Sequence, residues 1–203
     1  MGQFIVIEGG DKVGKSFLIS NLSLRLKNCI TVKFPNRLNF SGKIIDSHLR
    51  KENIITSPLA IHYLFIANRA EEHQNLEELI KNNDFVLADR YSLSNSIYTF
   101  SKNPTDFGLS NKEELKNLAF LPEFGPKPFL QIILIENQVE KLENRGDFGN
   151  EIFEKIEFQR KVNENFQNYA LNHSENVILL KSFEYDIETL IEEIHARCQV
   201  FNL

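Results

Sequence analysis

The stretch that decides the fold of this chain lies near its N-terminus and reads Gly9-Gly10-Asp11-Lys12-Val13-Gly14-Lys15-Ser16. It matches the phosphate-binding loop pattern G-x-x-x-x-G-K-[ST] in full. The apolar run 4–7 precedes the loop, and apolar residues at helical spacing follow it from Phe17. The pattern needs a strand before it and a helix after it, because the helix directs its free N–H groups and positive dipole end at phosphates. The sequence therefore predicts a protein that binds a nucleoside triphosphate, rather than a chance Gly-rich turn.

The loop supplies a suitable residue for each part of phosphate binding. The predicted phosphate-binding residues are Gly9, Gly10, Asp11, Lys12, Val13, Gly14, Lys15, Ser16 and Phe17. Gly9 and Gly14 permit a close backbone approach that a side chain would block. Lys15 is expected to reach the β- and γ-phosphates, and the Ser16 hydroxyl is a ligand for Mg²⁺.

Composition narrows the class of protein. The chain has 203 residues, two cysteines without paired spacing and a formal net charge of −5. This length predicts one domain. No apolar run approaches the roughly 20 residues that cross a bilayer, and no basic stripe is present to neutralise nucleic-acid phosphates. We expect no signal or transit peptide, no membrane or nucleic-acid partner, and an enzyme of the cytosol, with the nucleus left open as a second compartment.

Short apolar runs alternate with longer helical patterns along the chain. Strands are predicted at 3–8, 30–34, 85–89, 129–135 and 177–180. Helices are predicted at 14–27, 41–51, 57–82, 92–101, 111–120, 137–144, 151–172 and 185–199, and residues 102–128 are predicted to be rich in loops. The alternation predicts an α/β fold of the P-loop NTPase type, a three-layer sandwich in which helices cover both faces of a five-stranded parallel sheet.

Local signals refine two of these helices. Ser57 precedes Pro58 and is predicted to cap the helix at 57–82. One face of that helix is apolar and consists of Leu59, Tyr63, Ile66 and Ala70. Ser110 and Glu113 have the spacing of a capping box at the start of helix 111–120.

A second chemical signal is the pair Asp89-Arg90, which ends the apolar strand predicted at 85–89. In an open α/β sheet, ligands bind beyond the carboxyl ends of the strands. If this strand neighbours the one that carries the phosphate loop, Asp89 lies beside Mg²⁺ and Arg90 beside the transferred phosphoryl group. The alternative is that Asp89 and Arg90 are an ordinary pair of surface charges at the end of a strand.

Several further segments follow one another in a fixed order. They are Glu8 to Ser16, Phe34-Pro35-Asn36-Arg37, Ser41-Gly42-Lys43, Leu64-Phe65-Ile66-Ala67-Asn68-Arg69-Ala70-Glu71, Asp89-Arg90-Tyr91, Gly125-Pro126-Lys127-Pro128 and Arg145-Gly146 to Phe153-Glu154. In order and spacing they resemble the thymidylate kinase family over about three quarters of the chain. The resemblance implies ATP- and Mg²⁺-dependent phosphorylation of dTMP to dTDP by one nucleoside monophosphate kinase domain spanning 1–203, with a lid near 144–152. It also implies a homodimer that pairs through helices in the region of 57–82.

The resemblance implies roles for individual side chains. The catalytic residues are expected to be Lys12, Lys15, Arg90 and Arg145, and the metal-side residues Ser16 and Asp89. The substrate-binding residues are expected to be Asp11, Phe34, Arg37, Phe65, Asn68, Arg69, Arg90 and Phe153. Among these, Asp11 holds the sugar 3′-hydroxyl, Phe65 stacks on thymine and Arg69 hydrogen-bonds the base edge. Cations gathered around one point suit a reaction that joins two polyanions.

Three positions depart from the family pattern: Ala70 replaces a Trp, Phe129 an Asp and Phe153 a Tyr. They predict relaxed base specificity more than a change in phosphoryl transfer. Without the resemblance, other interpretations stay open. Phe65 could belong to the core, Arg37 to a surface loop, and Arg145-Gly146 to an ordinary helix end.

Other functions are alternatives to the phosphorylation of dTMP. A deoxynucleoside kinase, or another P-loop nucleoside monophosphate kinase, shares the loop, the acid-Arg strand end and the lid. A GTP-dependent switch is disfavoured, because Asn-Lys-x-Asp is absent and Asp89 does not begin an Asp-x-x-Gly. A nucleotide-binding protein without turnover is the remaining alternative.

Overall fold

The computed structural model describes residues 2–122, 125–146 and 148–200. Five strands form one sheet: β1 (Gln3–Gly9), β2 (Cys29–Lys33), β3 (Phe85–Asp89), β4 (Leu130–Ile135) and β5 (Val177–Lys181). All neighbouring strands pair in parallel, in the order β2-β3-β1-β4-β5. The predicted five-stranded parallel sheet is confirmed.

Helices connect the strands. The α-helices are α1 (Lys15–Ser23), α2 (Phe40–Leu49), α3 (Pro58–Glu71), α4 (His73–Asn82), α5 (Ser92–Phe100), α6 (Lys112–Ala119), α7 (Ile156–Asn172) and α8 (Ile187–Val200), and the 3₁₀ segments are η1 (Pro104–Phe107) and η2 (Val139–Asn144). None of these helices is long and apolar enough to span a membrane.

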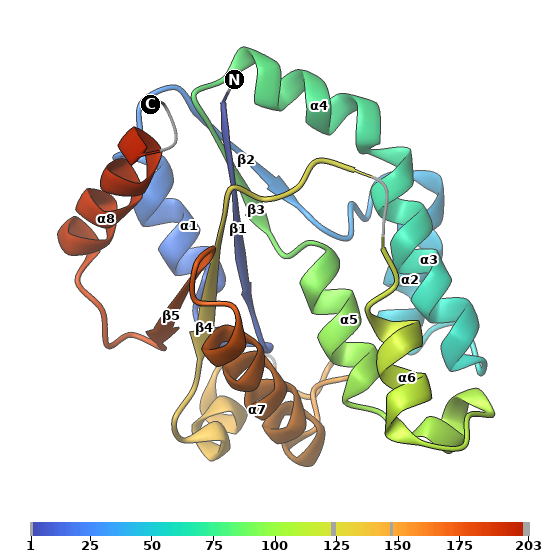
Figure 1. Ribbon diagram of the computed structural model, residues 1–203. Helices are drawn as coiled ribbons and strands as arrows, with labels where there is room; N and C mark the ends of the chain where they lie inside the picture. The colour runs from blue at the N-terminus through green and yellow to red at the C-terminus, as the bar shows by residue number, and fades with distance from the viewer. Residues whose placement is uncertain (1, 123–124, 147, 201–203) are drawn as a thin grey trace.

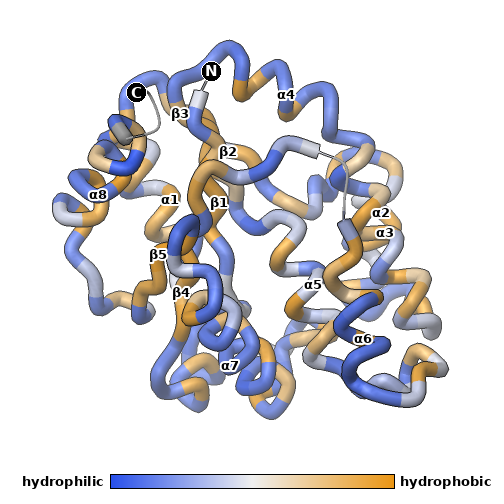
Figure 2. The backbone as a smooth tube through the Cα atoms, in the orientation of Figure 1, coloured by the Kyte–Doolittle hydropathy of each residue, from blue (hydrophilic) through white to orange (hydrophobic). Residues whose placement is uncertain are grey.

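Helices cover both faces of the sheet, as the alternation of side chains along a strand requires. On one face, Ile5 and Ile7 pack with α1 and α8. On the other, Phe4 and Val6 pack with α4, and β4 packs with α5 and α7. Figure 1 shows α1 and α8 on one side of the strands and α4, α5 and α7 on the other. The tube in Figure 2 is most hydrophobic along the strands between these layers.

The core makes the sheet a rigid support for the site at its edge. Ile5, Leu18 and Leu22 are fully buried, and each such side chain stabilises the fold by about 1.5–3 kcal/mol relative to leaving it exposed. In the register of β1 with β3, Ile7 lies opposite Asp89. The phosphate loop, which follows β1, and the Asp89-Arg90 pair therefore meet at the same edge of the sheet, as the sequence predicts.

The helix predicted at 57–82 is wrong as a single element, because the chain turns at Glu72 between α3 and α4. The two parts have different partners: α3 packs on α2 and α5, whereas α4 packs on the sheet. The Glu72 carboxylate accepts hydrogen bonds from Asn36 Nδ2 at 2.7 Å and Asn39 Nδ2 at 3.0 Å. Packing against two different surfaces, rather than helix propensity, therefore sets the break.

The apolar face predicted on helix 57–82 does not enter the core of this chain. Leu59 is 38% exposed and Tyr63 is 48% exposed. The buried residues of α3 are instead Ile61, His62, Asn68 and Arg69. The buried face of α3 thus carries the polar groups that surround the site described below, and its apolar face points outward.

Other boundaries also differ from the predictions. The helix predicted at 151–172 begins only at Ile156, because the Glu154 carboxylate accepts from the backbone N–H groups of Gly149 and Glu151 and holds that stretch in a loop. The helix predicted at 14–27 ends at Ser23, residues 139–144 form the 3₁₀ segment η2, and η1 lies within the predicted loop region.

The two capping predictions have different outcomes. Ser57 caps α3 as predicted, since its Oγ accepts from Ala60 N at 3.2 Å. At α6 the cap is Asn111 instead of Ser110. The Asn111 side chain accepts from the backbone N–H groups of Glu113 and Glu114, both at 3.0 Å.

Candidate active site

A cavity of about 570 Å³ opens at the carboxyl edge of the sheet. Its walls come from the phosphate loop, the ends of β2 and β3, helices α2, α3 and α5, and the segment 145–154. Most residues predicted from the sequence line it: Asp11, Lys12, Gly14, Lys15, Ser16, Phe17, Phe34, Arg37, Phe65, Arg69, Asp89, Arg90, Arg145 and Phe153. The cavity thus brings together side chains from distant parts of the chain.

The phosphate loop folds as the pattern requires. Gly14 is left-handed, with φ +96°, and a Cβ there would lie 2.8 Å from the Phe183 ring. The Lys15 side chain turns back into the loop, where Nζ donates to the Gly10 carbonyl. Burial, together with the nearby charge of Arg90, lowers the pKa of Lys15 to about 7. An ammonium this poorly solvated is poised to bind an anion.

Three residues of the predicted phosphate-binding set, Gly9, Gly10 and Val13, do not line the cavity. The Val13 side chain is only 1% exposed and belongs to the core. The carbonyls of Gly9 and Gly10 point toward the cations of the site and accept from Lys15 and Arg90. From behind the cavity wall, this part of the loop therefore orients two cations, Lys15 and Arg90, that line the cavity.

Arg90 is held in a left-handed conformation, with φ +69°. Its Nη1 donates to Gly9 O at 2.7 Å and to Ser94 Oγ at 3.1 Å, and its Nη2 donates to the Asp11 carboxylate. Burial opposes the charge of Arg90, but the surrounding polar groups outweigh it and raise the pKa of Arg90. The guanidinium is therefore charged and fixed at the junction of β3 with the phosphate loop.

Behind Arg90 lies Glu8, which the sequence analysis did not assign a role. Its carboxylate is fully buried and accepts from Tyr91 N at 3.1 Å, Ser94 N at 3.3 Å and the Ser94 hydroxyl. Burial raises the pKa of Glu8, against the opposing effect of the Ser94 hydrogen bond. Glu8 thus ties the strand that delivers the phosphate loop to the start of α5.

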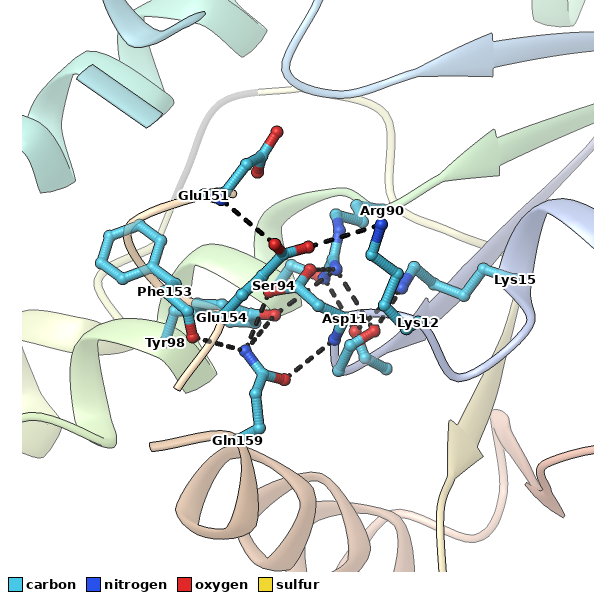
Figure 3. A network of polar contacts seen from close by, with 12 residues as sticks. Asp11, Lys12, Lys15, Arg90, Ser94, Tyr98, Glu151, Phe153, Glu154 and Gln159 are labelled. Atoms are coloured by element: carbon cyan, nitrogen blue, oxygen red, sulfur yellow. Dashed lines mark hydrogen bonds and ion pairs between the residues drawn. The ribbon is translucent and has the colours of Figure 1, made fainter. Parts of the chain in front are cut away.

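Asp11 is fixed by two further residues that the sequence analysis missed. Gln159 Nε2 donates to Asp11 Oδ2 at 2.8 Å and to Phe153 O at 3.0 Å. The Tyr98 hydroxyl lies 3.4 Å from both Gln159 Nε2 and Arg90 Nη2. Figure 3 shows these side chains converging on Asp11 from α5 and α7. No motif marks Gln159, because it lies within a regular helical pattern far from the loop.

Arg37 reaches the cavity from the loop after β2. Its guanidinium donates to Asp46 Oδ1 and to Glu151 Oε1, each at 2.7 Å. Burial disfavours the charged form, but these two carboxylates outweigh burial and raise the pKa of Arg37. Arg37 therefore remains charged and bridges α2 to the segment predicted as a lid.

Asn68 was predicted to contact substrate, but it does not line the cavity and is fully buried. Its Oδ1 accepts from Asn36 N at 2.8 Å, and its Nδ2 donates to Asn39 Oδ1 at 2.7 Å. These bonds hold the loop that carries Arg37. The structure therefore gives Asn68 a positioning role in place of a direct contact.

The end of the cavity away from the phosphate loop is apolar. Phe65 and Phe153 pack against the same cluster of Ile45, Leu49 and Ile61. Arg69, which is 5% exposed, also lines the cavity. Phe34, which is 4% exposed, packs edge-on to Tyr91. An aromatic surface with a charged donor nearby suits a flat heterocycle with polar edges.

The predicted lid, 144–152, touches the cavity through several described residues. Arg145 donates to Lys12 O at 3.0 Å and to Glu136, and its guanidinium lies 5.0 Å from the Phe183 ring centroid. Lys12 Nζ lies 3.6 Å from Glu154 Oε1. Asp147, which falls within the predicted lid, lies outside the described residues.

Asp89 and Ser16, which the sequence predicts to lie beside a metal ion, both line the cavity. Asp89 Oδ2 lies 3.1 Å from Lys33 Nζ, and Oδ1 is buried without a hydrogen-bond partner. Burial acts to raise the pKa of Asp89, but the charges of Lys15, Arg90 and Lys33 outweigh it and lower the pKa. Within the described part of the chain, no three His, Cys, Asp or Glu side chains cluster as metal ligands. A cation here would depend on Asp89, a hydroxyl and ligand oxygens.

Comparisons with known proteins agree with this geometry. The family model described as thymidylate kinase matches residues 7–196. The chain is 33% identical to the thymidylate kinase of Plasmodium falciparum, over 96% of this chain and 86% of that protein. It is 34% identical to the enzyme of Schizosaccharomyces pombe, over 97% and 89%.

A solved structure, the thymidylate kinase of Candida albicans, matches with a TM-score of 0.81 and 30% identity, covering 99% of this chain and 92% of that one. Broad substrate specificity is described for that protein. The family match, the relatives and the fold coincide over nearly the whole chain, and the chain therefore belongs to the thymidylate kinase family.

Proposed function

We propose that this protein transfers the γ-phosphoryl group of ATP to dTMP and forms dTDP and ADP. The observation that carries the proposal is that Arg37 lines the same cavity as Lys15. Lys15 belongs to the loop that binds the donor, and Arg37 provides a cation for a phosphate already present on the acceptor. A kinase acting on an uncharged hydroxyl would not require that second cation.

The chemistry follows from charge. An oxygen of the acceptor phosphate attacks the γ-phosphorus and ADP leaves, so repulsion between polyanions is the main barrier. Lys15 and Arg90 face the phosphate that moves, and Arg37 holds the acceptor phosphate. Fixed cations in a partly desolvated cavity stabilise the transition state more strongly than cations in water. No general base is needed, because the attacking phosphate is already anionic.

Mg²⁺ is the proposed metal, and the residues present suit it. Asp89 offers a buried carboxylate oxygen without a partner, and the exposed Ser16 hydroxyl lines the same cavity. Oxygen ligands of this kind are those that Mg²⁺ prefers. When bound, the ion neutralises phosphate charge. We expect Asp89→Asn to raise the Mg²⁺ concentration that gives half-maximal rate, while Asp84→Asn, at the opposite end of β3, leaves it unchanged.

We propose that residues 1–203 act as one kinase domain and that residues 144–152 close over the donor. Arg145 hydrogen-bonds the Lys12 carbonyl, so the proposed lid and the phosphate loop already touch, and Lys12 also pairs with Glu154, just beyond the lid. Closure would bring Lys12 and Arg145 to the transferred phosphoryl group and exclude water.

We also propose a homodimer. Leu59 and Tyr63 present apolar surface on the outward face of α3, and exposed apolar patches mark interfaces more often than isolated residues do. Light scattering tests this: a mass twice that of one chain is expected, and Tyr63→Glu should reduce it to that of one chain. A wild-type protein of single-chain mass would refute the dimer.

The decisive experiment supplies ATP and Mg²⁺ with either dTMP or thymidine and separates the products by chromatography. dTDP from dTMP, with no product from thymidine, is expected. Lys15→Ala controls for a contaminating kinase. Turnover of thymidine but not dTMP would assign a deoxynucleoside kinase, and binding of ATP without turnover of either would assign a binding protein. Adding dUMP, dCMP and dGMP measures how far Ala70 and Phe153 relax base selection.

A further inference from the structure

Lys102 is a partly buried cation in the apolar end of the cavity, and neither the motifs nor the mechanism above uses it. It follows α5 and precedes η1, and its side chain lines the cavity. Its Nζ lies 5.0 Å from the ring centroid of Phe153 and 5.9 Å from that of Phe107. Phe153 is the ring that packs on the same cluster as Phe65. Lys102 therefore sits at the end of the cavity where the acceptor base is expected.

This ammonium has no anionic partner among the residues that the structure describes. The two carboxylates nearby in the cavity wall are committed elsewhere, Glu151 to Arg37 and Glu154 to Lys12 and backbone N–H groups. Asp106 acts on Lys102 only through a longer-range charge interaction. Contact with ring faces compensates a partly buried cation only in part. The amine thus retains donor capacity directed into the cavity.

We propose that Lys102 is a specificity-determining residue that donates a hydrogen bond to a carbonyl oxygen of the acceptor base. The inference rests on the proposed function, in which the base stacks on Phe65. Thymine carries two carbonyl oxygens. Arg69 enters the cavity from α3 and Lys102 from the end of α5, so the two donors come from different walls and serve different carbonyls.

The first test compares Lys102→Met, which keeps the length of the side chain but removes charge and donor, with Lys102→Arg, which keeps both. A hydrogen bond from a charged donor is worth about tenfold or more in binding. Lys102→Met should therefore raise the KM for dTMP about tenfold with little change in kcat. Lys102→Arg should keep the KM of the wild type. Lys116→Met, an exposed lysine on α6, is the matched control and should behave as wild type.

The second test identifies the atom. In 2-thio-dTMP and 4-thio-dTMP, one carbonyl oxygen is replaced by sulfur, a weaker acceptor. If Lys102 donates to that position, the analogue is a poorer substrate than dTMP for the wild type but not for Lys102→Met. If the wild type loses activity with either analogue and Lys102→Met does not, the proposal is supported. Equal losses in both proteins for both analogues overturn it and leave Lys102 with a structural role.

The pH dependence gives an independent readout. Burial lowers the pKa of Lys102 to about 8. Within the described chain, three groups face Lys102: His48 from α2, Asp106 from η1 and Lys112 from α6, which donates to the Lys102 carbonyl. Burial, followed by the charge of Lys102, lowers the pKa of His48. The KM for dTMP should rise as the pH passes 8 in the wild type and stay level in Lys102→Arg. The same rise in both proteins would overturn the assignment.

Failure of this inference is distinguishable from failure of the proposed function. If the wild type does not phosphorylate dTMP, the function itself is wrong. If it does, and Lys102→Met retains the wild-type KM for dTMP and the wild-type response to both analogues, only the role of Lys102 is wrong. Melting temperatures within a few degrees of wild type confirm that each variant is folded. If Lys102→Met does not fold, the pH dependence of the KM for dTMP in Lys102→Arg still tests the proposal.

Discussion

The side chain of Gln159 binds Asp11 twice, although the two residues lie 148 positions apart. Gln159 Oε1 accepts from Asp11 N at 2.9 Å, and Nε2 donates to Asp11 Oδ2 at 2.8 Å. The carboxylate also accepts from Arg90. Helix α7 therefore fixes the first half of the phosphate loop, at Asp11, in a way that the loop sequence does not reveal.

Replacement of Gln159 by Leu should disturb this arrangement without emptying the core. The Asp11 carboxylate would lose one donor and its backbone N–H would lose its acceptor, so the orientation of Asp11 toward the acceptor sugar would loosen. We expect the KM for dTMP to rise about tenfold. Steady-state kinetics measure this, with Gln167→Leu, an exposed residue of the same helix, as the control. The same KM for dTMP in the two variants would show that Gln159 has no role in binding the acceptor.

Lys15→Ala should lower kcat by about 100-fold or more, because a cation poised for transition-state charge is lost. The melting temperature should change little, since the Lys15 side chain hydrogen-bonds only to loop carbonyls within the part of the chain that the structure describes. Lys43→Ala, on the exposed surface of α2, is the control. A Lys15→Ala enzyme with wild-type turnover would show that the loop does not bind the reacting phosphate.

The pH dependence of ATP use should reflect Lys15. Burial and the charge of Arg90 lower its pKa to about 7, so the free enzyme carries a charged Lys15 below pH 7 and progressively loses that charge above it. kcat/KM for ATP should therefore decline from pH 7 to 9. kcat should decline less, because bound phosphates favour the charged form. A kcat/KM for ATP that stays constant across this range would contradict the assignment.

Phe65→Ala should mainly raise the KM for dTMP, by about tenfold, because the base loses an aromatic surface. Phe65 lies partly exposed at the cavity, so the cost in stability should be smaller than the roughly 3–5 kcal/mol of a core Phe→Ala change. Phe40→Ala, at a residue that is 78% exposed, is the control. A large drop in melting temperature with an unchanged KM would assign Phe65 to the core instead.

Glu8 should make stability depend on pH. Burial raises its folded pKa above the ordinary 4.5, so above pH 4.5 the native state keeps a proton that the unfolded chain releases. Stability therefore falls as the pH rises from 4.5 through the folded pKa. Glu8→Gln, which does not titrate, should show a smaller fall in melting temperature over this interval. Parallel curves for the two proteins would mean that Glu8 titrates normally.

Much of this arrangement can be predicted from the sequence, because its signals are local. Residues 9–16 define a loop whose chemistry requires a strand before it and a helix after it, and the apolar runs confirm both. Asp89 and Arg90 are predictable for the same reason, since they end a strand in a sheet that binds ligands at its carboxyl edge.

The rest depends on contacts between distant segments. Nothing local distinguishes Gln159 from other polar helix residues, or Lys102 from a surface lysine, until α5 and α7 are placed. The turn at Glu72 has the same origin, because α3 and α4 pack on different surfaces. Asn68 carries a strong local signal, yet its side chain faces the Arg37 loop instead of the cavity.

Arg37 holds two carboxylates, Asp46 and Glu151, before any phosphate arrives. Because a guanidinium pairs bidentately with phosphate oxygens, a dianionic phosphate ester competes with these carboxylates more strongly than chloride does. Glu151 lies in the predicted lid and Asp46 in α2, so the Arg37 side chain joins these two segments. A phosphate ester that replaced Glu151 on Arg37 would break this link between the two segments.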